Sequence, residues 1–348
     1  MAPPALAARL EALLQRHWWR ATPTPLMHLL RPLAALAGWY AQQQRRALQA
    51  AQARVPVPVV VVGNLIVGGA GKTPTVVALV QALQRAGWHP GVISRGHGRN
   101  GSAAQAVGPG STAAEVGDEP LLIRRRTGVP VWVGRQRVAA ARALCAANVE
   151  VDLLVSDDGL QHHALARDLE VVVFDERGVG NGLLLPAGPL REALPAQLSE
   201  WPASRLVLYN AARQSTPLPG AMLERRLSAA VPLADWHAGR LEAAVPLSHW
   251  HGRPVWAAAG IAAPERFFAM LETEGLHLQR VPLPDHHAWA TLPWPEGTAE
   301  VLVTEKDAVK IDPARVGKTR VWVVGLDFAL PHTFTQEVLR RLGAPRSR

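Results

Sequence analysis

The sequence is poor in lysine, in cysteine and in long apolar runs, and each shortage limits what the protein can be. Only four of its 37 basic residues are lysines, so a retained lysine marks a position where a guanidinium group would be too large or wrongly shaped. The single cysteine, Cys145, excludes an internal disulfide and fits a reducing compartment. Arg31 and Pro32 interrupt the most hydrophobic segment, so none reaches the roughly 18 residues that cross a bilayer.

Positive charge is concentrated near the N-terminus. The formal net charge is +9, and residues 1–50 contain six arginines against one acid, Glu11. Leucines at helical spacing predict one or two amphipathic helices there, the second kinked at Pro32. Aromatic residues lie between the arginines, namely Trp18, Trp19, Trp39 and Tyr40. This mixture suits a helix in an anionic headgroup layer, and it suits equally well a helix packed on the main domain with its arginines facing solvent. The two arrangements are compatible in part.

The start of the chain has no basic leader before its apolar part, so we expect no secretory signal. A protein of this kind is expected in the cytosol or on the cytosolic face of a membrane.

From residue 57 onward, apolar runs alternate with helical segments. The run at 57–64 is rich in valine, as in a strand buried on both faces. Further strands are expected at 91–94, 129–133, 151–156, 169–175 and 205–210, with helices between several of them. This alternation predicts an α/β fold of the phosphate-loop NTPase type, with a mostly parallel sheet covered by helices on both faces.

The pattern loosens after Tyr209, and a second alternation of strands and helices begins at residue 254. We therefore expect an amphipathic helical segment at 1–50 and a core at 51–215. A linker region at 216–250 and a smaller C-terminal α/β domain at 251–348 complete the predicted organisation.

The segment 66–75, IVGGAGKTPT, carries the clearest functional signal. It lies between a predicted strand and a predicted helix, as a phosphate-binding loop does, although Ile66 stands where the general pattern has its first glycine. Lys72 would reach the terminal phosphates of a nucleotide, and the Thr73 hydroxyl would bind Mg²⁺. The predicted cradle comprises Gly68, Gly69, Ala70, Gly71, Lys72, Thr73 and Pro74. A structural turn that happens to contain a lysine is the alternative.

Acidic residues stand at the ends of predicted elements in two places. Asp157 and Asp158 end an apolar strand, where a phosphate-loop protein keeps the carboxylate that orients Mg²⁺. A polar strand end with a capping Asp is the alternative there. Asp118 and Glu119 precede a predicted helix, where an N-cap and first-turn acids opposing the helix dipole are the simplest interpretation. Catalysis by Asp118 is the alternative.

Histidines and arginines in loops complete the candidates. The adjacent histidines at 162–163 and 286–287 lack zinc-site spacing, so we expect no metal site from either pair. One histidine acting with a carboxylate on a substrate proton remains open. Loops after parallel strands commonly bind ligands, so Arg95, Arg99 and Arg191 are candidates for phosphate contacts, with surface charge as the alternative.

Taken in order, these segments resemble one family, the tetraacyldisaccharide 4′-kinases of lipid A biosynthesis. The resemblance covers most of the chain and is carried by VGNLIVGGAGKTP, ISRGHGR, GDEPLLI, SDDGLQHHALARDLEVVVFD, GNGLLLPAGPLRE, AGIAAPERFF, PDHHAW and TEKDAVK. The family's loop also lacks the first glycine, so the resemblance favours a working nucleotide site. His97 departs from the family, where a tyrosine is expected, and nucleotide stacking is therefore not carried over to that ring.

The resemblance implies transfer of the γ-phosphoryl group of ATP, with Mg²⁺, to the 4′-hydroxyl of an acylated glucosamine disaccharide 1-phosphate. It also implies a peripheral protein on the cytosolic face of a bacterial inner membrane, attached to the anionic surface through its N-terminal helix.

The same resemblance assigns roles to individual residues. Asp118 looks like the base for the sugar hydroxyl, assisted by His286, while Lys72 and Arg191 act at the phosphates. The implied Mg²⁺ ligands are Thr73, Asp157, Asp158 and Glu192.

Two other functional classes stay open. A switch-type ATPase or GTPase shares the phosphate loop, although TEKD at 304–307 only nearly matches the guanine motif Asn/Thr-Lys-x-Asp. The calculated pI of about 10.8 prompts a nucleic-acid binder, but we expect no nucleic-acid partner because no motif for one is present.

Overall fold

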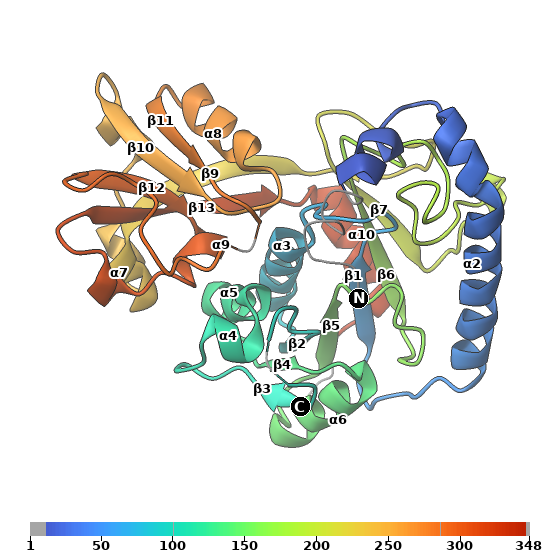
Figure 1. The fold of residues 1–348 in the computed structure, drawn as a ribbon. Coiled ribbons are helices and arrows are strands. Elements are labelled where there is room, and N and C mark those ends of the chain that lie inside the picture. Colours follow the sequence, from blue (N-terminus) through green and yellow to red (C-terminus); the bar gives the residue numbers. More distant parts are fainter. Residues whose placement is uncertain (1–11, 100, 286, 346–348) are drawn as a thin grey trace. The chain divides into compact units, whose positions relative to one another are not determined.

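The computed structural model describes residues 12–99, 101–285 and 287–345 (Figure 1). The chain forms two compact units. The first contains the described residues of Met1–Ser94, Gln136–Glu224 and Leu330–Arg348, and the second contains those of Arg95–Arg135 and Arg225–Ala329.

A parallel sheet forms the centre of the first unit and confirms the predicted fold class. Its strands here are β1 (Val59–Gly63), β2 (Pro90–Ser94), β5 (Leu153–Asp157), β6 (Leu169–Asp175), β7 (Arg205–Asn210) and β8 (Ala221–Met222). They lie in the order β2-β5-β1-β6-β7-β8, and every neighbouring pair is parallel. All five residues of β1 are buried, as its run of valines predicts.

Three helices accompany this sheet, α3 (Lys72–Arg85), α6 (Arg137–Ala147) and α10 (His332–Leu342). Helix α3 follows β1 and buries nine of its residues, from Thr73 to Leu83. Helix α10 comes from the end of the chain and packs against α3 and β6. The strand–loop–helix segment that leads from β1 into α3 therefore lies in the interior of the first unit.

The second unit has its own five-stranded sheet, in the order β11-β10-β12-β13-β9. Its strands are β9 (Glu224–Pro232), β10 (Pro254–Ala259), β11 (His277–Pro282), β12 (Glu300–Thr304) and β13 (Arg320–Ala329). A short antiparallel pair, β3 (Gln105–Ala106) and β4 (Val131–Val133), lies in the same unit. Trp250 and Phe268, both fully buried, stand at the centre of its apolar core.

The remaining elements are short. The helices of the second unit are α4 (Ala113–Val116), α5 (Asp118–Thr127), α7 (Leu233–His237), α8 (Pro264–Thr273) and α9 (Glu305–Ala308). Single 3-10 turns occur at Leu198–Glu200, Leu241–Ala243, Leu247–Trp250 and Pro313–Arg315.

The two units do not follow the linear division that the sequence predicts. The predicted linker at 216–250 contains β9, which lies beside β13 and so belongs to the second sheet. Residues 95–135 of the predicted core join the second unit, and α10 returns to the first. Hydrophobic periodicity reports where elements lie along the chain, whereas unit membership depends on contacts between distant segments.

The N-terminal segment contains α2, a helix of 26 residues from Pro25 to Ala50 that continues through Pro32. One face of α2 attaches to the first unit. Met27 and Ala34 are buried, a Cβ on Gly38 would lie 2.6 Å from the Leu184 Cδ1 atom, and Arg45 pairs with Glu192 at 3.0 Å. Residues 27, 34, 38 and 45 share one side of a helix.

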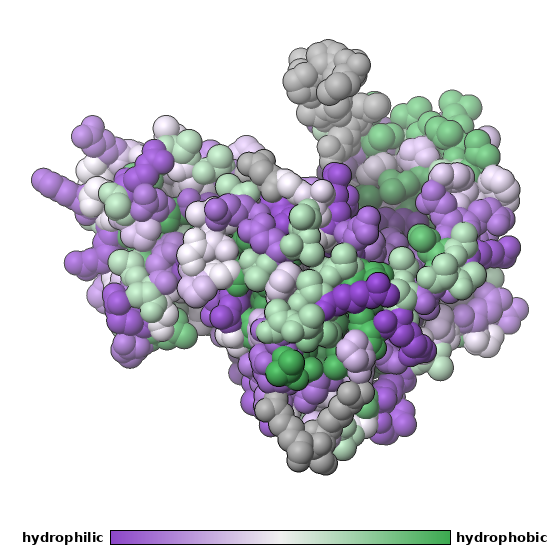
Figure 2. All heavy atoms as spheres, turned by 90° about the horizontal axis from the view of Figure 1, so that it is seen from below, coloured by the Kyte–Doolittle hydropathy of each residue, from purple (hydrophilic) through white to green (hydrophobic). Residues whose placement is uncertain are grey.

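The opposite face of α2 is apolar and exposed. Leu29 is 78% exposed, and Leu33, Leu36, Trp39 and Tyr40 are each more than half exposed. Figure 2 shows hydrophobic residues gathered at the upper right, on the side of the molecule where α2 lies in Figure 1. The leucine face is therefore not the face that packs on the unit. Within the described residues, no helix is both long and apolar enough to span a membrane.

Trp18 and Trp19 contact the first unit, as the alternative of a packed N-terminal segment expects. Trp18 is only 7% exposed, and its indole N–H donates to the Pro186 carbonyl at 2.9 Å. The Arg177 guanidinium lies over the Trp19 ring, 4.3 Å from its centroid. Both rings contact residues of the loop after β6. Of the four N-terminal aromatics, Trp39 and Tyr40 in α2 are the ones that remain exposed.

Phe268→Ala tests the core of the second unit. Removing this fully buried ring leaves a cavity, so the free energy of unfolding should fall by about 3–5 kcal/mol in urea titrations. Leu241→Ala is the matched control, because Leu241 is 61% exposed and should change stability by less than about 0.5 kcal/mol. Equal losses in the two variants would contradict the assigned core.

Candidate active site

The glycine-rich loop lies between β1 and α3, and its backbone explains its composition. Gly68 and Gly71 have φ angles of 84° and 85°, a left-handed conformation that side-chain-bearing residues rarely adopt. Gly71 is the N-cap of α3, and Lys72 is the first residue of the helix. The N–H groups at the start of α3 thus face the loop, as an anion site requires.

Side chains from three other segments anchor the loop carbonyls. Asn64 Nδ2 donates to the Gly68 oxygen at 3.0 Å, Arg177 Nη2 to Gly69 at 2.8 Å, and Asn210 Nδ2 to Ala70 at 3.0 Å. In a trans peptide the N–H points opposite to the carbonyl. The N–H groups of residues 69, 70 and 71 therefore point away from these donors, which is the arrangement of a preorganised anion nest.

Lys72 lies between the loop and the acids at the end of β5. Its Nζ atom donates to Asn64 Oδ1 at 3.3 Å and lies 3.6 Å from Asp158 Oδ1. Arg191 Nη1 lies 3.6 Å from the same carboxylate oxygen. Asp158 has a φ angle of 48°, an uncommon conformation for a residue other than glycine. Two cations therefore converge on Asp158.

Asp157 is buried at the last position of β5. Residues Val62 and Asp157 are register partners, so the carboxyl ends of β1 and β5 meet at one edge of the sheet. Ser94 Oγ, at the end of β2, donates to Asp157 Oδ2 at 3.0 Å. Asp157 thus lies where ligands bind in open parallel sheets.

A polar network continues from this edge through Gln161 and Glu192. Gln161 Oε1 accepts from Arg191 at 3.2 Å, and Gln161 Nε2 donates to Glu192 Oε1 at 3.1 Å. Glu192 Oε2 also lies 3.0 Å from Arg45 Nη1 and 3.5 Å from Arg205 Nη2. Both oxygens of Glu192 therefore already hold donors from the protein.

The histidines at 162 and 163 have different surroundings. His162 Nε2 accepts the Arg137 backbone N–H at 3.0 Å, so this nitrogen carries no proton in the structure. His163 is buried, and desolvation lowers its pKa to about 4, with Arg167 and Arg45 acting in the same direction against Glu192 and Glu170. Among the residues that the structure describes, no cluster of three or more His, Cys, Asp or Glu side chains forms a metal site.

Asp118 lies in the second unit, as the first residue of α5. Gly117, with a φ angle of 92°, is the N-cap, so Asp118 does not cap the helix as the simplest interpretation expects. Its Oδ1 atom accepts the Glu119 backbone N–H at 2.9 Å, and the residue is 6% exposed.

Lys306, one of the four lysines, lies among carboxylates of the second unit. Its Nζ atom is 3.4 Å from Asp285 and 3.7 Å from Glu119. Burial lowers the pKa of Lys306, but Glu119, Asp118 and Asp285 together raise it further, so the net shift is upward. A charged lysine therefore stands near Asp118, Glu119 and Asp285.

The fully buried Asp307 holds the segment around Trp289. Its Oδ1 accepts the Trp289 indole N–H at 3.0 Å, and its Oδ2 accepts the Gly260 N–H at 3.0 Å and the Thr304 hydroxyl at 2.7 Å. His286 belongs to the same loop but lies outside the described residues. The TEKDAVK segment thus supplies both Lys306 and the residue that anchors this loop.

The structure brings most predicted residues of the first unit together, namely Lys72, Thr73, Asp157, Asp158, Arg191 and Glu192. Sequence reasoning missed the residues that contact them or the loop backbone, which are Asn64, Ser94, Arg137, Gln161, Arg177 and Asn210. Asn64 and Asn210 directly follow or end strands, which is the one signal that could have identified them. The scarcity of lysine does point to Lys306.

The chain is similar to known proteins along most of its length. The family model described as tetraacyldisaccharide-1-P 4′-kinase matches residues 26–343. Proteins called tetraacyldisaccharide 4′-kinase from Leptothrix cholodnii and Methylibium petroleiphilum are 53% and 54% identical, over 98% and 94% of this chain and 98% and 93% of their own lengths. The LpxK protein of Aquifex aeolicus, solved in complex with ATP, superposes with a TM-score of 0.73 at 24% identity, over 91% of this chain and 100% of that one.

The low pKa of His163 predicts a loss of stability in mild acid. The unfolded chain takes up a proton below about pH 6.5, whereas folded His163 does so only near pH 4. Stability is therefore fully present above pH 6.5 and should fall by on the order of 2 kcal/mol between pH 6.5 and 4.

Urea titrations of wild type and His163→Gln across this range would measure the effect, since the variant should lose this part of the pH dependence. His277→Gln, at an exposed position, is the control and should keep it. An unchanged profile in His163→Gln would mean that other groups cause the acid sensitivity.

Proposed function

The chain belongs to the tetraacyldisaccharide-1-P 4′-kinase family, and from this membership and the site geometry we propose that it transfers the γ-phosphoryl group of ATP to the 4′-hydroxyl of a tetraacyldisaccharide 1-phosphate. The reaction is a step of lipid A biosynthesis. The proposal that ATP binds here rests mainly on the loop after β1. Its carbonyl groups accept hydrogen bonds from Asn64, Arg177 and Asn210.

In this proposal the loop binds the ATP phosphates through its inward N–H groups and the N-terminus of α3. Lys72 and Arg191 neutralise negative charge on the phosphates. Both cations lie 3.6 Å from Asp158 Oδ1, an ion-pair distance from which they can shift toward phosphate without a large rearrangement. Phosphoryl transfer depends mainly on positioning and charge neutralisation, and these residues supply both.

Mg²⁺ fits the oxygen donors at this edge of the sheet. Thr73, Asp157 and Asp158 offer a hydroxyl and two carboxylates, and Mg²⁺ commonly takes one or two protein carboxylates together with phosphate and water. When bound, the ion would offset negative charge on the phosphates. Glu192 remains a proposed ligand, although it must first exchange a contact with Arg45 or Gln161.

We assign the acceptor side of the reaction to the second unit. Asp118 accepts the proton of the 4′-hydroxyl, and His286 assists it. Lys306 places positive charge beside Asp118, Glu119 and Asp285, which offsets the mutual repulsion of three carboxylates.

We place the protein at the cytosolic surface of the bacterial inner membrane, because its acceptor is an acylated lipid. The exposed face of α2 suits this role. Leu29, Leu33 and Leu36 present an apolar surface, flanked by Trp39 and Tyr40, that would insert below the headgroups. The opposite face of the helix keeps it attached to the first unit.

Lys72→Ala and Asp118→Asn test the two halves of the site separately. We expect Lys72→Ala to lower kcat by at least about 100-fold, through lost phosphate stabilisation. Asp118→Asn should lower it by roughly 100- to 10,000-fold, through loss of the base. The assay is transfer of labelled γ-phosphate from ATP to a detergent-dispersed tetraacyldisaccharide 1-phosphate.

Asp235→Asn is the matched control, since Asp235 pairs with the exposed Arg240 and has no role in the proposed reaction. A folded Asp118→Asn enzyme with a near-normal rate would remove Asp118 as the base. Labelled inorganic phosphate without labelled lipid from the wild type would instead favour a switch-type ATPase.

The α2 face makes a separate prediction about membrane binding. Replacing Leu29, Leu33 and Leu36 together by Ser should weaken binding to anionic vesicles by at least about 10-fold, because each leucine loses apolar burial in the bilayer. Thermal stability and ATP binding should not change, since all three side chains are exposed. Leu241→Ser is the control in an exposed position elsewhere. Vesicle binding equal to that of wild type would overturn the role of α2.

A further inference from the structure

Arg177 connects the phosphate loop to the N-terminal segment of the chain. Its Nη2 atom donates to the Gly69 carbonyl at 2.8 Å. Its guanidinium group also lies over the ring of Trp19, which precedes α2 and is far from Arg177 in the sequence. All three residues belong to the first unit. One side chain therefore touches both the loop and the segment that leads into α2.

Asp175, the fully buried last residue of β6, fixes the base of this arginine. Arg177 Nε donates to Asp175 Oδ2 at 2.9 Å, and Arg177 Nη2 lies 2.8 Å from the same oxygen. Asp175 and Asn210 are register partners at the ends of β6 and β7. Together they serve neighbouring carbonyls of the loop, since Arg177 binds that of Gly69 and Asn210 binds that of Ala70.

The bond to Gly69 orients one N–H group of the anion nest. The Gly69 carbonyl and the Ala70 N–H belong to the same peptide plane and point in opposite directions. Arg177 therefore turns that N–H toward the expected position of the nucleotide phosphates. Gly68 leaves space for the contact, because a Cβ there would lie 3.3 Å from Arg177 Nη1. The orientation of this N–H depends on where the guanidinium group is held.

The half-buried Trp19 ring is the third partner of the guanidinium group. An indole face attracts a guanidinium cation and shields one side of it from water. The ring itself is closely packed, since a Cβ on Gly180 would lie 3.2 Å from Trp19 Cε3. The neighbouring Trp18 fastens the segment, because its carbonyl accepts the Asn181 N–H at 2.8 Å and its indole N–H donates to the Pro186 carbonyl at 2.9 Å. The position of Trp19 is therefore built into the fold.

The stretch that receives Trp18 also pairs with the start of the phosphate loop. The Val67 N–H donates to the Pro189 carbonyl at 2.9 Å, and the Arg191 N–H donates to the Leu65 carbonyl at 2.7 Å. The N-terminal segment thus supports the phosphate loop at two places, through Arg177 and through residues 186–191.

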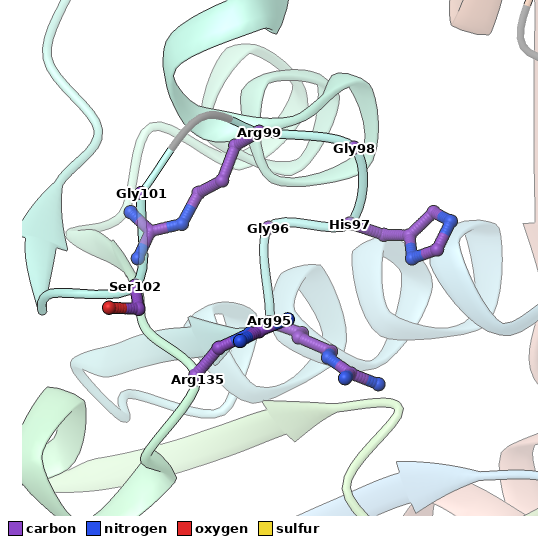
Figure 3. A pocket seen from close by; sticks show the side chains of 8 residues that line it. All are labelled: Arg95, Gly96, His97, Gly98, Arg99, Gly101, Ser102 and Arg135. Carbon is purple, nitrogen blue, oxygen red and sulfur yellow. The ribbon is translucent and has the colours of Figure 1, made fainter. Parts of the chain in front are cut away.

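Arginines elsewhere in the protein lack such support. Figure 3 shows a cavity of about 500 Å³ in the second unit, with Arg95, Arg99 and Arg135 in its lining. In that view the Arg99 side chain reaches toward Ser102. The described lining contains neither a carboxylate nor a tryptophan. Arg177 has both kinds of partner, which is the arrangement expected of a cation that must stay in one place.

We propose that Trp19 and Arg177 are positioning residues for ATP, with Trp19 holding the guanidinium group against the Gly69 carbonyl so that the N-terminal segment sets the affinity of the phosphate loop for the nucleotide. This inference rests on the proposed function, in which ATP is the donor. Both residues act through the Gly69–Ala70 peptide. Because α2 follows Trp19, the segment proposed to meet the lipid surface is also the segment that supports the ATP loop.

The test measures binding of ATP with Mg²⁺ by titration calorimetry of the full chain, together with steady-state kinetics. The variants are Trp19→Leu, Trp19→Phe, Arg177→Lys and the double variant Trp19→Leu/Arg177→Lys. Leucine stays apolar but has no π face, and phenylalanine restores one. Lysine keeps a cation beside the buried Asp175 but lacks the planar fork. Trp256→Leu, at another half-buried tryptophan in β10, is the control, and thermal unfolding checks that each variant is folded.

Trp19→Leu should weaken ATP binding by roughly 5-fold and raise the KM for ATP to match, with kcat and the KM for the acceptor nearly unchanged. Trp19→Phe should recover most of this affinity, and Trp256→Leu should bind ATP like wild type. Arg177→Lys should weaken ATP binding by roughly 10-fold. The double variant should bind ATP no more weakly than Arg177→Lys alone, because both changes act through one carbonyl.

Three results would overturn the proposal. The first is wild-type ATP affinity in Trp19→Leu, whether or not its binding to anionic vesicles is weakened. The second is an equal loss in the Leu and Phe variants, which would assign the effect to packing alone. The third is a loss in the double variant equal to the product of the two single losses.

Direct ATP binding also separates this inference from the proposed function. If wild type labels no lipid but its ATP affinity depends on Trp19 and Arg177 as described, the proposed function fails while the positioning role stands. If wild type labels the lipid and the Trp19 variants bind ATP as wild type does, the proposed function stands and the positioning role fails.

Discussion

The parallel register between β1 and β5 is the constraint on which the nucleotide site depends. It places Val62 opposite Asp157, so the loop after β1 and the acids after β5 emerge at the same edge of the sheet. Because β2 lies on the other side of β5, Ser94 reaches Asp157 as well. A shift of this register would separate Lys72 from Asp158 and remove the common edge.

Behind that edge, the charged residues form a continuous series of contacts rather than isolated pairs. Glu170 is bound by Arg167 at 3.0 Å and by Arg205, and Arg205 also approaches Glu192. Burial raises the pKa of Glu170, but Arg205 and Arg167 lower it more, and the net direction is downward. Glu170 therefore stays ionised, and the series continues through Gln161 and Arg191 to Asp158. Such a network can hold Arg191 in place through more than one partner.

Both units pair buried acids with arginines. In the first unit Glu170 contacts Arg167 and Arg205, and in the second the buried Glu305 contacts Arg126. The second unit also places Lys306 near Asp118, Glu119 and Asp285, and these three acids raise the pKa of the lysine. Opposite charges therefore accompany these buried groups in each unit.

Much of this molecule could be predicted from local patterns. Valine runs predicted β1 and its neighbours, glycines and a rare lysine predicted the phosphate loop, and the order of the motifs predicted the family. These features depend on short stretches of sequence, where side-chain type and backbone conformation are directly related.

Other features required the tertiary structure. The sequence placed the leucines of α2 on one face, but only contacts with Leu184 and Glu192 decided that this face is the exposed one. The anchors Arg177 and Asn210 lie more than 100 residues from the loop they hold, and no periodicity relates them to it. The sequence by itself determined where the main strands and helices lie, which residues make up the glycine-rich loop, and to which family the chain belongs. The tertiary structure decided which segments share a unit and which side chains orient the site, because those depend on contacts between residues far apart in the chain.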